Sequence, residues 1–261
     1  MLLLQLLAAM SIKTPEELEK LRQIGRIVGR VLREMRAQVR PGVTTRELDA
    51  VAARVFAETG ARSAPALVYK FPGETCISVN DEAVHGIPGD RRLQSGDLVK
   101  LDVTAEKDGY MADAAVTVPV GDIAPQARSL MHCAHRAFHR AARIARSGVS
   151  IQRVGAVIEN EVRRSGFSVL PELSGHGIGR SIHEPPTVPN FSDPTARGTF
   201  TEGLVITIEP IIAVGSDHRA FTRSYVEKDG WTVRTSDGTL SAHYEHTIVI
   251  TKNRPIVLTA A

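Results

Sequence analysis

The sequence repeats one pattern at a constant spacing of 106 residues, and this repeat limits the folds that the chain can adopt. Segment 40–60 begins Arg-Pro-Gly-Val and ends in Gly, while segment 146–166 begins Arg-Ser-Gly-Val and also ends in Gly. At the same spacing, without a gap, Leu98-Val99 corresponds to Leu204-Val205. An unchanged spacing over this length predicts a duplicated α+β unit of two helices and a strand. Two such halves that face each other would leave a cleft between their sheets.

Local signals place the helices and strands of the first half. Thr14 can cap a helix whose first position is Pro15, and Glu17 completes a capping box. A 3.6-residue apolar stripe continues this helix until Pro41-Gly42 ends it. The other predicted elements are a helix that opens at Thr44-x-x-Glu47 and ends at Gly60, strands at 76–79 and 98–104, a hairpin turn at 107–109, and a returning strand at 110–120.

The composition is that of an ordinary globular protein, with 43% hydrophobic and 23% charged residues among 261. No low-complexity linker divides the chain, so residues 11–261 are predicted to form one domain, with pseudo-repeats at about 14–120 and 121–250. Segment 170–202 is rich in Gly and Pro, and we interpret it as a loop that carries function. The net charge of +3 is too small to indicate specific DNA binding.

Neither the cysteines nor the N-terminus indicates export or a membrane. Cys76 and Cys133 are too few for a disulfide framework and form no C-x-x-C pair, so a reducing cytoplasm is the simplest compartment. Residues 1–10 (MLLLQLLAAM) are too short to span a bilayer and lack the basic residues of a signal peptide. We interpret them as an extension or as a start assigned ahead of Met10. An export signal and a packed apolar tail are the alternatives.

Four acids stand within or beside apolar strands. Asp102 and Asp113 flank the predicted hairpin turn, Glu209 follows Leu-Val-Ile-Thr-Ile, and Glu245 precedes His-Thr-Ile-Val-Ile. A buried carboxylate costs several kcal/mol unless it is paired, hydrogen-bonded or bound to a cation. Each acid alone could be a strand end that faces water. Four of them in two facing halves, with no matching buried Arg or Lys, favour one or two divalent cations.

His176 is a fifth candidate ligand, because it lies in the glycine-rich segment Ser174-Gly175-His176-Gly177. The flanking glycines let the backbone approach closely, and imidazole is a common metal ligand. Four carboxylates and one imidazole form a hard, oxygen-rich set that favours Mn(II), Fe(II) or Co(II), allows Zn(II), and excludes a thiolate zinc site.

Seven short motifs, in order and at compatible spacings, carry a resemblance to a known family. They are Ala83-Val84-His85-Gly86-Ile87-Pro88, Leu101-Asp102-Val103-Thr104, Asp108-Gly109-Tyr110-Met111-Ala112-Asp113, Gly175-His176-Gly177-Ile178-Gly179, Ile182-His183-Glu184-x-Pro186, Thr207-Ile208-Glu209-Pro210 and Tyr244-Glu245-His246-Thr247. On these motifs the sequence resembles the type I methionine aminopeptidases, and the likeness runs from Ser11 to about Leu258.

Insertions separate the types of this family. Type II enzymes carry a long insertion between their last two glutamate ligands, whereas 35 residues lie between Glu209 and Glu245 here. Eukaryotic type I enzymes add an N-terminal zinc-binding segment, and no Cys/His cluster precedes Thr14. The resemblance is therefore to the short bacterial form.

The resemblance implies an α+β pita-bread fold. In this fold two duplicated helix-helix-strand halves are related by pseudo-twofold symmetry around a central antiparallel sheet with a dinuclear metal site. It also implies that Asp113 and Glu245 bridge two divalent ions per chain and that Asp102 holds one ion. His176 and Glu209 would complete the coordination of the other ion.

The resemblance further implies the reaction. Enzymes of this family remove the starting methionine from newly made proteins whose second residue is small, by attack of a metal-bridging water or hydroxide on the peptide carbonyl. Glu209 would move the proton, His183 would stabilise the tetrahedral intermediate, and His85 would position the substrate or assist the leaving amine. Outside this motif context, His85 and His183 would be interpreted as loop histidines bonded to backbone.

The family's methionine pocket corresponds to four residues of this sequence. They are Tyr69, Phe71, Cys76 and Trp231. The family spaces the tyrosine and the next aromatic residue one position further apart than Tyr69-Lys70-Phe71 does. This departure leaves two alternatives, a displaced Tyr69 or residues that belong to the core.

Several remaining features have simpler interpretations. The first helix is basic, which fits a solvated face or a surface that contacts the ribosome, where the substrates emerge. His132, His135 and His139 include the i, i+4 spacing of a chelate, but no acid motif supports them, and we interpret them as exposed. His218 and His243 have no predicted role. The expected partners are N-terminal peptides, and the chain is expected to be a monomer.

Two other functions compete with the aminopeptidase. X-Pro aminopeptidases and prolidases share the fold but carry an additional N-terminal domain, for which residues 1–40 leave no room. Pita-bread proteins that only bind partners have lost their metal ligands, whereas all five ligand positions are filled here.

Overall fold

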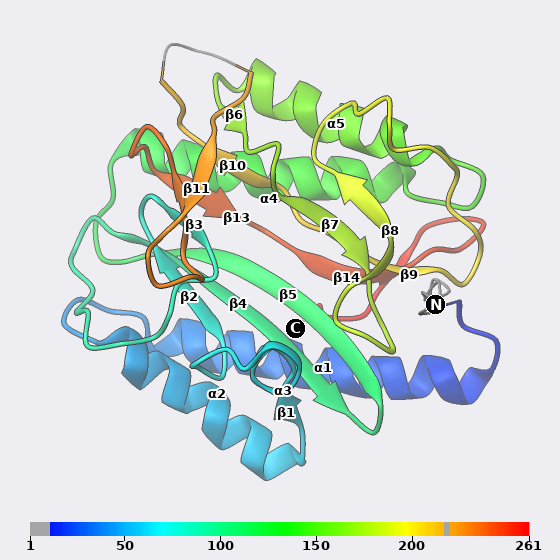
Figure 1. The fold of residues 1–261 in the computed structure, drawn as a ribbon, viewed down its shortest axis with the longest axis horizontal. Helices are drawn as coiled ribbons and strands as arrows, with labels where there is room; N and C mark the ends of the chain where they lie inside the picture. Colours follow the sequence, from blue (N-terminus) through cyan, green and yellow to red (C-terminus); the bar gives the residue numbers. More distant parts are fainter. Residues whose placement is uncertain (1–10, 217–219, 261) are drawn as a thin grey trace, which may run out of the picture.

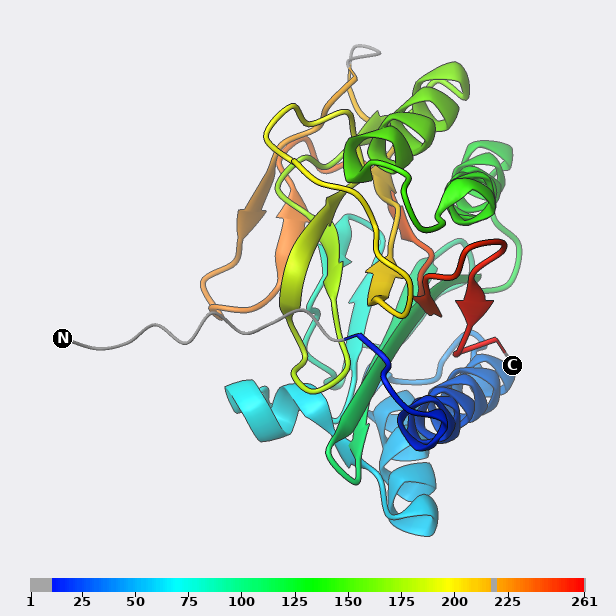
Figure 2. The same ribbon diagram turned by 90° about the vertical axis from the view of Figure 1, so that its right-hand side faces the viewer.

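Four long helices lie on two sides of a group of antiparallel strands, as Figures 1 and 2 show. The computed structural model describes residues 11–216 and 220–260, so the predicted extension at residues 1–10 lies outside the described residues. The helices are α1 (Pro15–Gln38), α2 (Thr45–Thr59), the short α3 (Ala64–Tyr69), α4 (Pro125–Ile144) and α5 (Ile151–Arg164). Within the described part of the chain, none of the helices combines the length and the apolar composition needed to cross a membrane.

The predicted caps of the first two helices are confirmed, but the predicted capping box is found only at α2, since at α1 the Glu17 carboxylate accepts a hydrogen bond from the backbone N–H of Lys13. The Thr14 hydroxyl accepts a hydrogen bond from the backbone N–H of Glu17 at the start of α1. At α2 the capping box between Thr44 and Glu47 is complete, and Gly60 ends the helix in the left-handed conformation at φ 68°. The apolar stripes of both helices then pack on the strands that follow them.

The strands form four antiparallel groups. The first contains β1 (Arg62–Ser63), β2 (Cys76–Val79), β4 (Leu98–Lys107) and β5 (Tyr110–Pro119). The second contains β6 (Ser168–Val169), β10 (Ile211–Ala213) and β13 (Ser241–His243), and the third β3 (Glu82–Val84), β11 (Ser224–Val226) and β12 (Val233–Thr235). The fourth contains β7 (Ser174–Gly177), β8 (Glu184–Pro189), β9 (Val205–Ile208), β14 (His246–Val249) and β15 (Ile256–Val257).

Backbone hydrogen bonds join the first group of strands to the fourth across the middle of the molecule. Ala115 on β5 and Glu245, which directly precedes β14, exchange hydrogen bonds in both directions. The side chain of Thr247 on β14 accepts a bond from the N–H of Asp113 and donates one to its carbonyl oxygen. Strands from both halves of the sequence therefore meet in one central, antiparallel arrangement.

The repeat in the sequence corresponds to a repeat of elements. Helices α2 and α5 begin at residues 45 and 151, and each is followed by a glycine with positive φ, at Gly60 and Gly166. Strands β4 and β9 begin at residues 98 and 205, at nearly the same spacing. Helices α1 and α2 pack against β4 and β5 in one apolar core, and α4 and α5 pack against β9 and β14 in a second. The predicted α+β class is confirmed, while the boundary at about residue 120 stays a prediction.

The prediction of a loop throughout segment 170–202 is wrong, because the segment contains strands β7 and β8. Its glycines serve close packing of neighbouring backbones. A Cβ atom on Gly175 would lie 2.6 Å from the carbonyl oxygen of Thr207, and one on Gly177 would lie 2.2 Å from that of Pro185. Glycine here marks tight strand pairing rather than an open loop.

Candidate metal centre

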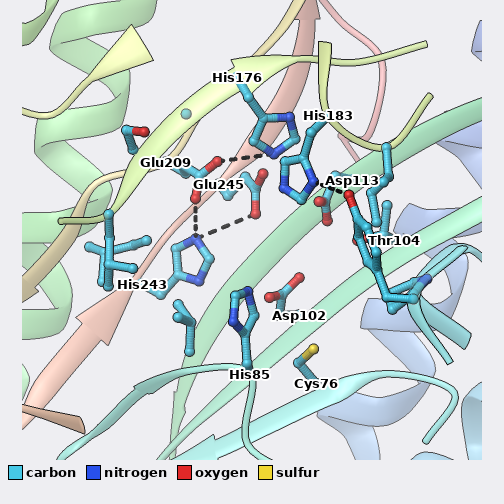
Figure 3. A pocket seen from close by; sticks show the side chains of 18 of the residues that line it. Cys76, His85, Asp102, Thr104, Asp113, His176, His183, Glu209, His243 and Glu245 are labelled. Atoms are coloured by element: carbon cyan, nitrogen blue, oxygen red, sulfur yellow. Dashed lines mark hydrogen bonds and ion pairs between the residues drawn. The ribbon is translucent and has the colours of Figure 1, made fainter. Parts of the chain in front are cut away.

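A cavity of about 720 Å³ opens between the two halves, and every predicted site residue lines it. Figure 3 shows its interior. The lining includes Tyr69, Phe71, Cys76, His85, Asp102, Asp113, His176, His183, Glu209, Trp231 and Glu245. These residues come from segments far apart in the sequence, and the fold brings all of them together.

The β4–β5 hairpin places the first two acids on one face. Its turn uses positive φ at Asp108 and Gly109, and the resulting register sets Thr104 opposite Asp113. Asp102 stands two residues before Thr104, so it shares the face and lies diagonally across from Asp113. Both carboxyl groups therefore point into the cavity (Figure 3).

The second pair of acids stands where β9 ends and β14 begins. Ile208 pairs with His246, so Glu209 and Glu245 come directly after and before two paired residues. The Thr207 hydroxyl donates to Glu209 Oε1 at 2.8 Å. The backbone bonds between Glu245 and Ala115 bring this pair of acids up to the first pair.

His176 on β7 is oriented by two hydrogen bonds. Its backbone N–H donates to the Thr207 hydroxyl at 3.0 Å, and its ring Nδ1 lies 2.9 Å from the carbonyl oxygen of Gly177. Since a carbonyl can only accept, Nδ1 carries the proton and Nε2 has a free lone pair. Nε2 lies 3.4 Å from Glu209 Oε1, and burial lowers the pKa of His176 to about 3. A neutral imidazole with Nε2 facing the acids is suited to bind a metal ion.

The four carboxyl groups repel one another. Burial raises the pKa of Asp113 to about 6. Burial, followed by the charges of neighbouring acids, raises the pKa of Asp102, Glu209 and Glu245 well above their usual values. Among the described residues, no Lys or Arg forms an ion pair with any of the four. The buried oxygens Asp113 Oδ1 and Glu245 Oε1 have no hydrogen-bond partner. Divalent cations would supply the missing positive charge and the missing partners, so the residues fit such ions.

The ligand atoms fall into two overlapping groups. Asp113, His176 and Glu245 each offer an atom within 4.8 Å of the others, and so do Glu209, His243 and Glu245. Asp102 belongs to neither group, although it lines the same cavity. His243 received no role from the sequence. The signal that could have found it is strand alternation, because residues two apart on a strand face the same side and His243 precedes Glu245 by two.

Two histidines approach the carboxylates from the cavity walls. His183 stacks edge-on to His176 with ring centres 4.3 Å apart, and its Nδ1 lies 2.6 Å from the hydroxyl of Tyr69. His85 follows β3 in the left-handed conformation, at φ 59°. The surrounding protein lowers the pKa of His183 and lowers that of His85 to about 4. Both rings are therefore neutral at physiological pH.

An apolar wall completes the cavity. Phe71 is buried and meets Trp231 edge to face, with ring centres 5.2 Å apart. Cys76 stands directly opposite Asp102 in the β2–β4 pairing. Burial, reinforced by the charge of Asp102, raises the pKa of the Cys76 thiol, so the thiol stays neutral. Tyr69 is 43% exposed, which places it at the rim of the cavity rather than in the core.

The remaining predicted histidines lie elsewhere. His132, His135 and His139 are exposed on α4, as predicted. His218 lies outside the described residues.

Comparison with known proteins gives consistent matches along nearly the whole chain. Residues 19–252 match metallopeptidase family M24. Methionine aminopeptidase 2 of Bacillus subtilis is 42% identical over 253 residues, which cover 96% of this chain and 99% of the relative. The solved structure of a methionine aminopeptidase from Thermotoga maritima matches with a TM-score of 0.91 and 35% identity, covering 97% of this chain and 100% of that one.

A prolidase from Pyrococcus furiosus shares the fold at a lower level of similarity. It matches with a TM-score of 0.74 and 25% identity, covering 96% of this chain and 65% of the prolidase. These matches confirm the predicted pita-bread fold and the predicted resemblance. The chain therefore belongs to metallopeptidase family M24, and its relatives in that family include methionine aminopeptidases that it matches over nearly its whole length.

Proposed function

We propose that this chain removes the N-terminal methionine from newly made proteins, using divalent metal ions held by five side chains. These are Asp102, Asp113, His176, Glu209 and Glu245. One observation carries the proposal: three buried carboxyl groups, the half-buried carboxyl group of Asp102 and a neutral imidazole line a cavity to which the described residues contribute no Lys or Arg side chain. Hard oxygen donors favour Mn(II), Fe(II) or Co(II) in two neighbouring positions, with Zn(II) as an alternative.

A divalent ion in such a site polarises the scissile carbonyl and lowers the pKa of bound water. The side chains of the protein transfer protons and stabilise the charge that develops on the substrate. Glu209, held by the Thr207 hydroxyl, can take a proton from the attacking water and pass it to the leaving amine. His183 can donate to the developing oxyanion, and His85 faces the same space from the opposite wall.

The apolar wall is proposed to bind the methionine side chain. Phe71, Trp231 and the neutral thiol of Cys76 form a surface that suits an unbranched thioether. Since this wall adjoins the carboxylates, a methionine seated there would bring its peptide bond to the metal site. Tyr69 stands at the rim and supports His183 rather than the thioether.

A peptide panel tests the proposed function. Metal-stripped protein is expected to regain activity with Mn(II) or Co(II), and to cleave Met-Ala-Ser at least ~10-fold faster than Met-Lys-Ser, because a small second residue fits where a long one collides. Release of methionine is measured by chromatography. Faster cleavage of Ala-Pro-Ala would support an X-Pro peptidase instead, and no hydrolysis with any divalent ion would support a binding protein.

Tyr69→Phe tests the proposed role of His183. A tyrosine hydroxyl that donates to Nδ1 leaves the ring proton on Nε2, which can then donate to the substrate oxygen. Loss of one such bond is worth roughly 1 kcal/mol, so kcat is expected to fall about 5- to 10-fold with little change in KM. Tyr225→Phe removes the hydroxyl of an exposed tyrosine on β11 that does not line the cavity, and is the matched control. Equal kcat in both variants would argue against this role.

We further propose that the chain works as a monomer in the cytoplasm, with residues 11–261 as one catalytic domain and repeats at about 14–120 and 121–250. We also propose that the basic surface of α1 contacts the ribosome. Several arginines of α1 are already paired, because Arg26 contacts Glu19 and Arg30 contacts Glu34. The basic residues left for a ribosomal surface are therefore fewer than the sequence alone suggests.

A further inference from the structure

His243 is a buried histidine that the proposed ligand set leaves unexplained. Its side chain is almost fully enclosed, and neither ring nitrogen makes a hydrogen bond among the described residues. A buried polar group without a partner is rare in folded proteins and calls for a reason. His243 is also aimed: its ring points between the carboxyl groups of Glu209 and Glu245 (Figure 3).

The distances around His243 suit a shared cation better than a hydrogen bond. Its Nε2 lies 3.4 Å from Glu245 Oε2 and 3.8 Å from Glu209 Oε2. An N–H···O hydrogen bond is normally close to 2.9 Å. Two donors on one ion, each about 2.1 Å from it, stand about 3 to 3.5 Å apart. The three atoms therefore have nearly the spacing of ligands around one ion.

We propose that His243 is an additional nitrogen ligand of the metal centre, binding a divalent ion together with Glu209 and Glu245. This inference rests on the proposed metal site and extends it. The backbone places the ring firmly, because His243 and Thr117 exchange hydrogen bonds through the Thr117 hydroxyl, both at 2.8 Å. These bonds use only the main chain of His243, so its side chain can be changed without losing them.

A second imidazole alters the chemistry of the site. With His176 and His243 both present, each of the two groups of ligand atoms contains one nitrogen donor. Imidazole favours Co(II) and Zn(II) over Mn(II) and Mg(II), whereas carboxylates favour the latter ions. We therefore expect a stronger preference for Co(II) over Mn(II) in this chain than in the same chain with His243 replaced.

The test compares metal-stripped wild-type protein with His243→Gln and His243→Leu. Co(II) binding is measured by calorimetry, and the number of imidazoles bound to Co(II) is measured by X-ray absorption. With two Co(II) bound per chain, the wild-type protein is expected to show an average of about one imidazole per Co(II) and each variant about one half, and one Co(II) is expected to bind at least ~10-fold more weakly in the variants. An unchanged imidazole count would overturn the proposal, because a residue outside the coordination sphere can weaken binding but cannot remove a ligand.

Two controls separate this inference from the metal site itself. Asp113→Asn is expected to weaken Co(II) binding as well. If the wild-type protein itself does not bind Co(II), the proposed metal site is wrong, and the role of His243 falls with it. Thermal unfolding of metal-free protein checks the fold. Since the His243 ring nitrogens make no hydrogen bond among the described residues, His243→Leu is expected to unfold at the same temperature as wild-type protein or higher. His243→Gln, which retains a polar side chain, gives the second measurement of the imidazole count.

Discussion

Asp113→Asn is expected to lower kcat/KM by more than about 100-fold and, in the metal-free protein, to preserve or raise the thermal midpoint. Loss of a residue that merely supports a metal ligand already costs ~10- to 100-fold, so loss of a ligand should cost more. The gain in stability has a separate cause. The charge of Asp113 contributes to the raised pKa of Asp102, Glu209 and Glu245, so its neutralisation relieves a shared repulsion.

The control for this pair of effects is Glu172→Gln. Glu172 lines the same cavity, but it lies at the rim and contacts Arg223 and Ser224 instead of the four acids. Its replacement is expected to change kcat/KM by less than about 3-fold, since exposed ion pairs contribute little. The proposed ligand set would be contradicted by an Asp113→Asn enzyme that retains wild-type turnover. A large loss of stability without metal would instead show that Asp113 holds the fold together.

The sequence predicted those features of this molecule that depend on neighbouring residues. Thr14, Thr44 and Gly60 mark helix ends through contacts within a few positions, and the structure has helix ends there. The acids could be recognised because a carboxylate inside an apolar strand is unusual wherever that strand lies. Segment 170–202 was misjudged because its Gly and Pro content suggests a loop, while its pairing with β9 depends on residues further along the chain.

The missed parts of the site depend on contacts between distant segments. His243 is the last residue of β13, and its two-residue spacing relates it to Glu245, but its place beside Glu209 comes from the pairing of β13 with β10, which no local pattern predicts. Tyr69 and His183 are 114 residues apart, and the bond between them requires both halves to be assembled. The unusual spacing at Tyr69-Lys70-Phe71 left open whether the tyrosine is displaced or belongs to the core, and only the assembled cavity shows that its hydroxyl reaches a histidine.

Removal of bound metal is expected to lower the thermal midpoint by about 5 to 10 °C. An ion that binds only the folded chain stabilises it by about 2.7 kcal/mol when its concentration is 100 times Kd. In a chain of this size, 1 kcal/mol corresponds to roughly 2 to 4 °C. The repulsion among the four acids is present only when the chain is folded and metal-free. Removal of the ions by a chelator therefore restores this repulsion, which lowers the free energy of unfolding.

The measurement is calorimetric unfolding of chelator-treated protein across a series of Mn(II) or Co(II) concentrations. For the wild-type chain the midpoint should rise with each tenfold increase in metal, because the binding free energy grows with the logarithm of concentration. Asp113→Asn should respond less, since it has lost both a ligand and part of the repulsion that the metal relieves. If the thermal midpoint of the wild-type chain did not change with the concentration of divalent ions, the negative charge of the four acids would be neutralised without metal, by protons shared among their carboxyl groups. In that case the raised pKa of Asp113 would describe the working state of the protein rather than its metal-free form.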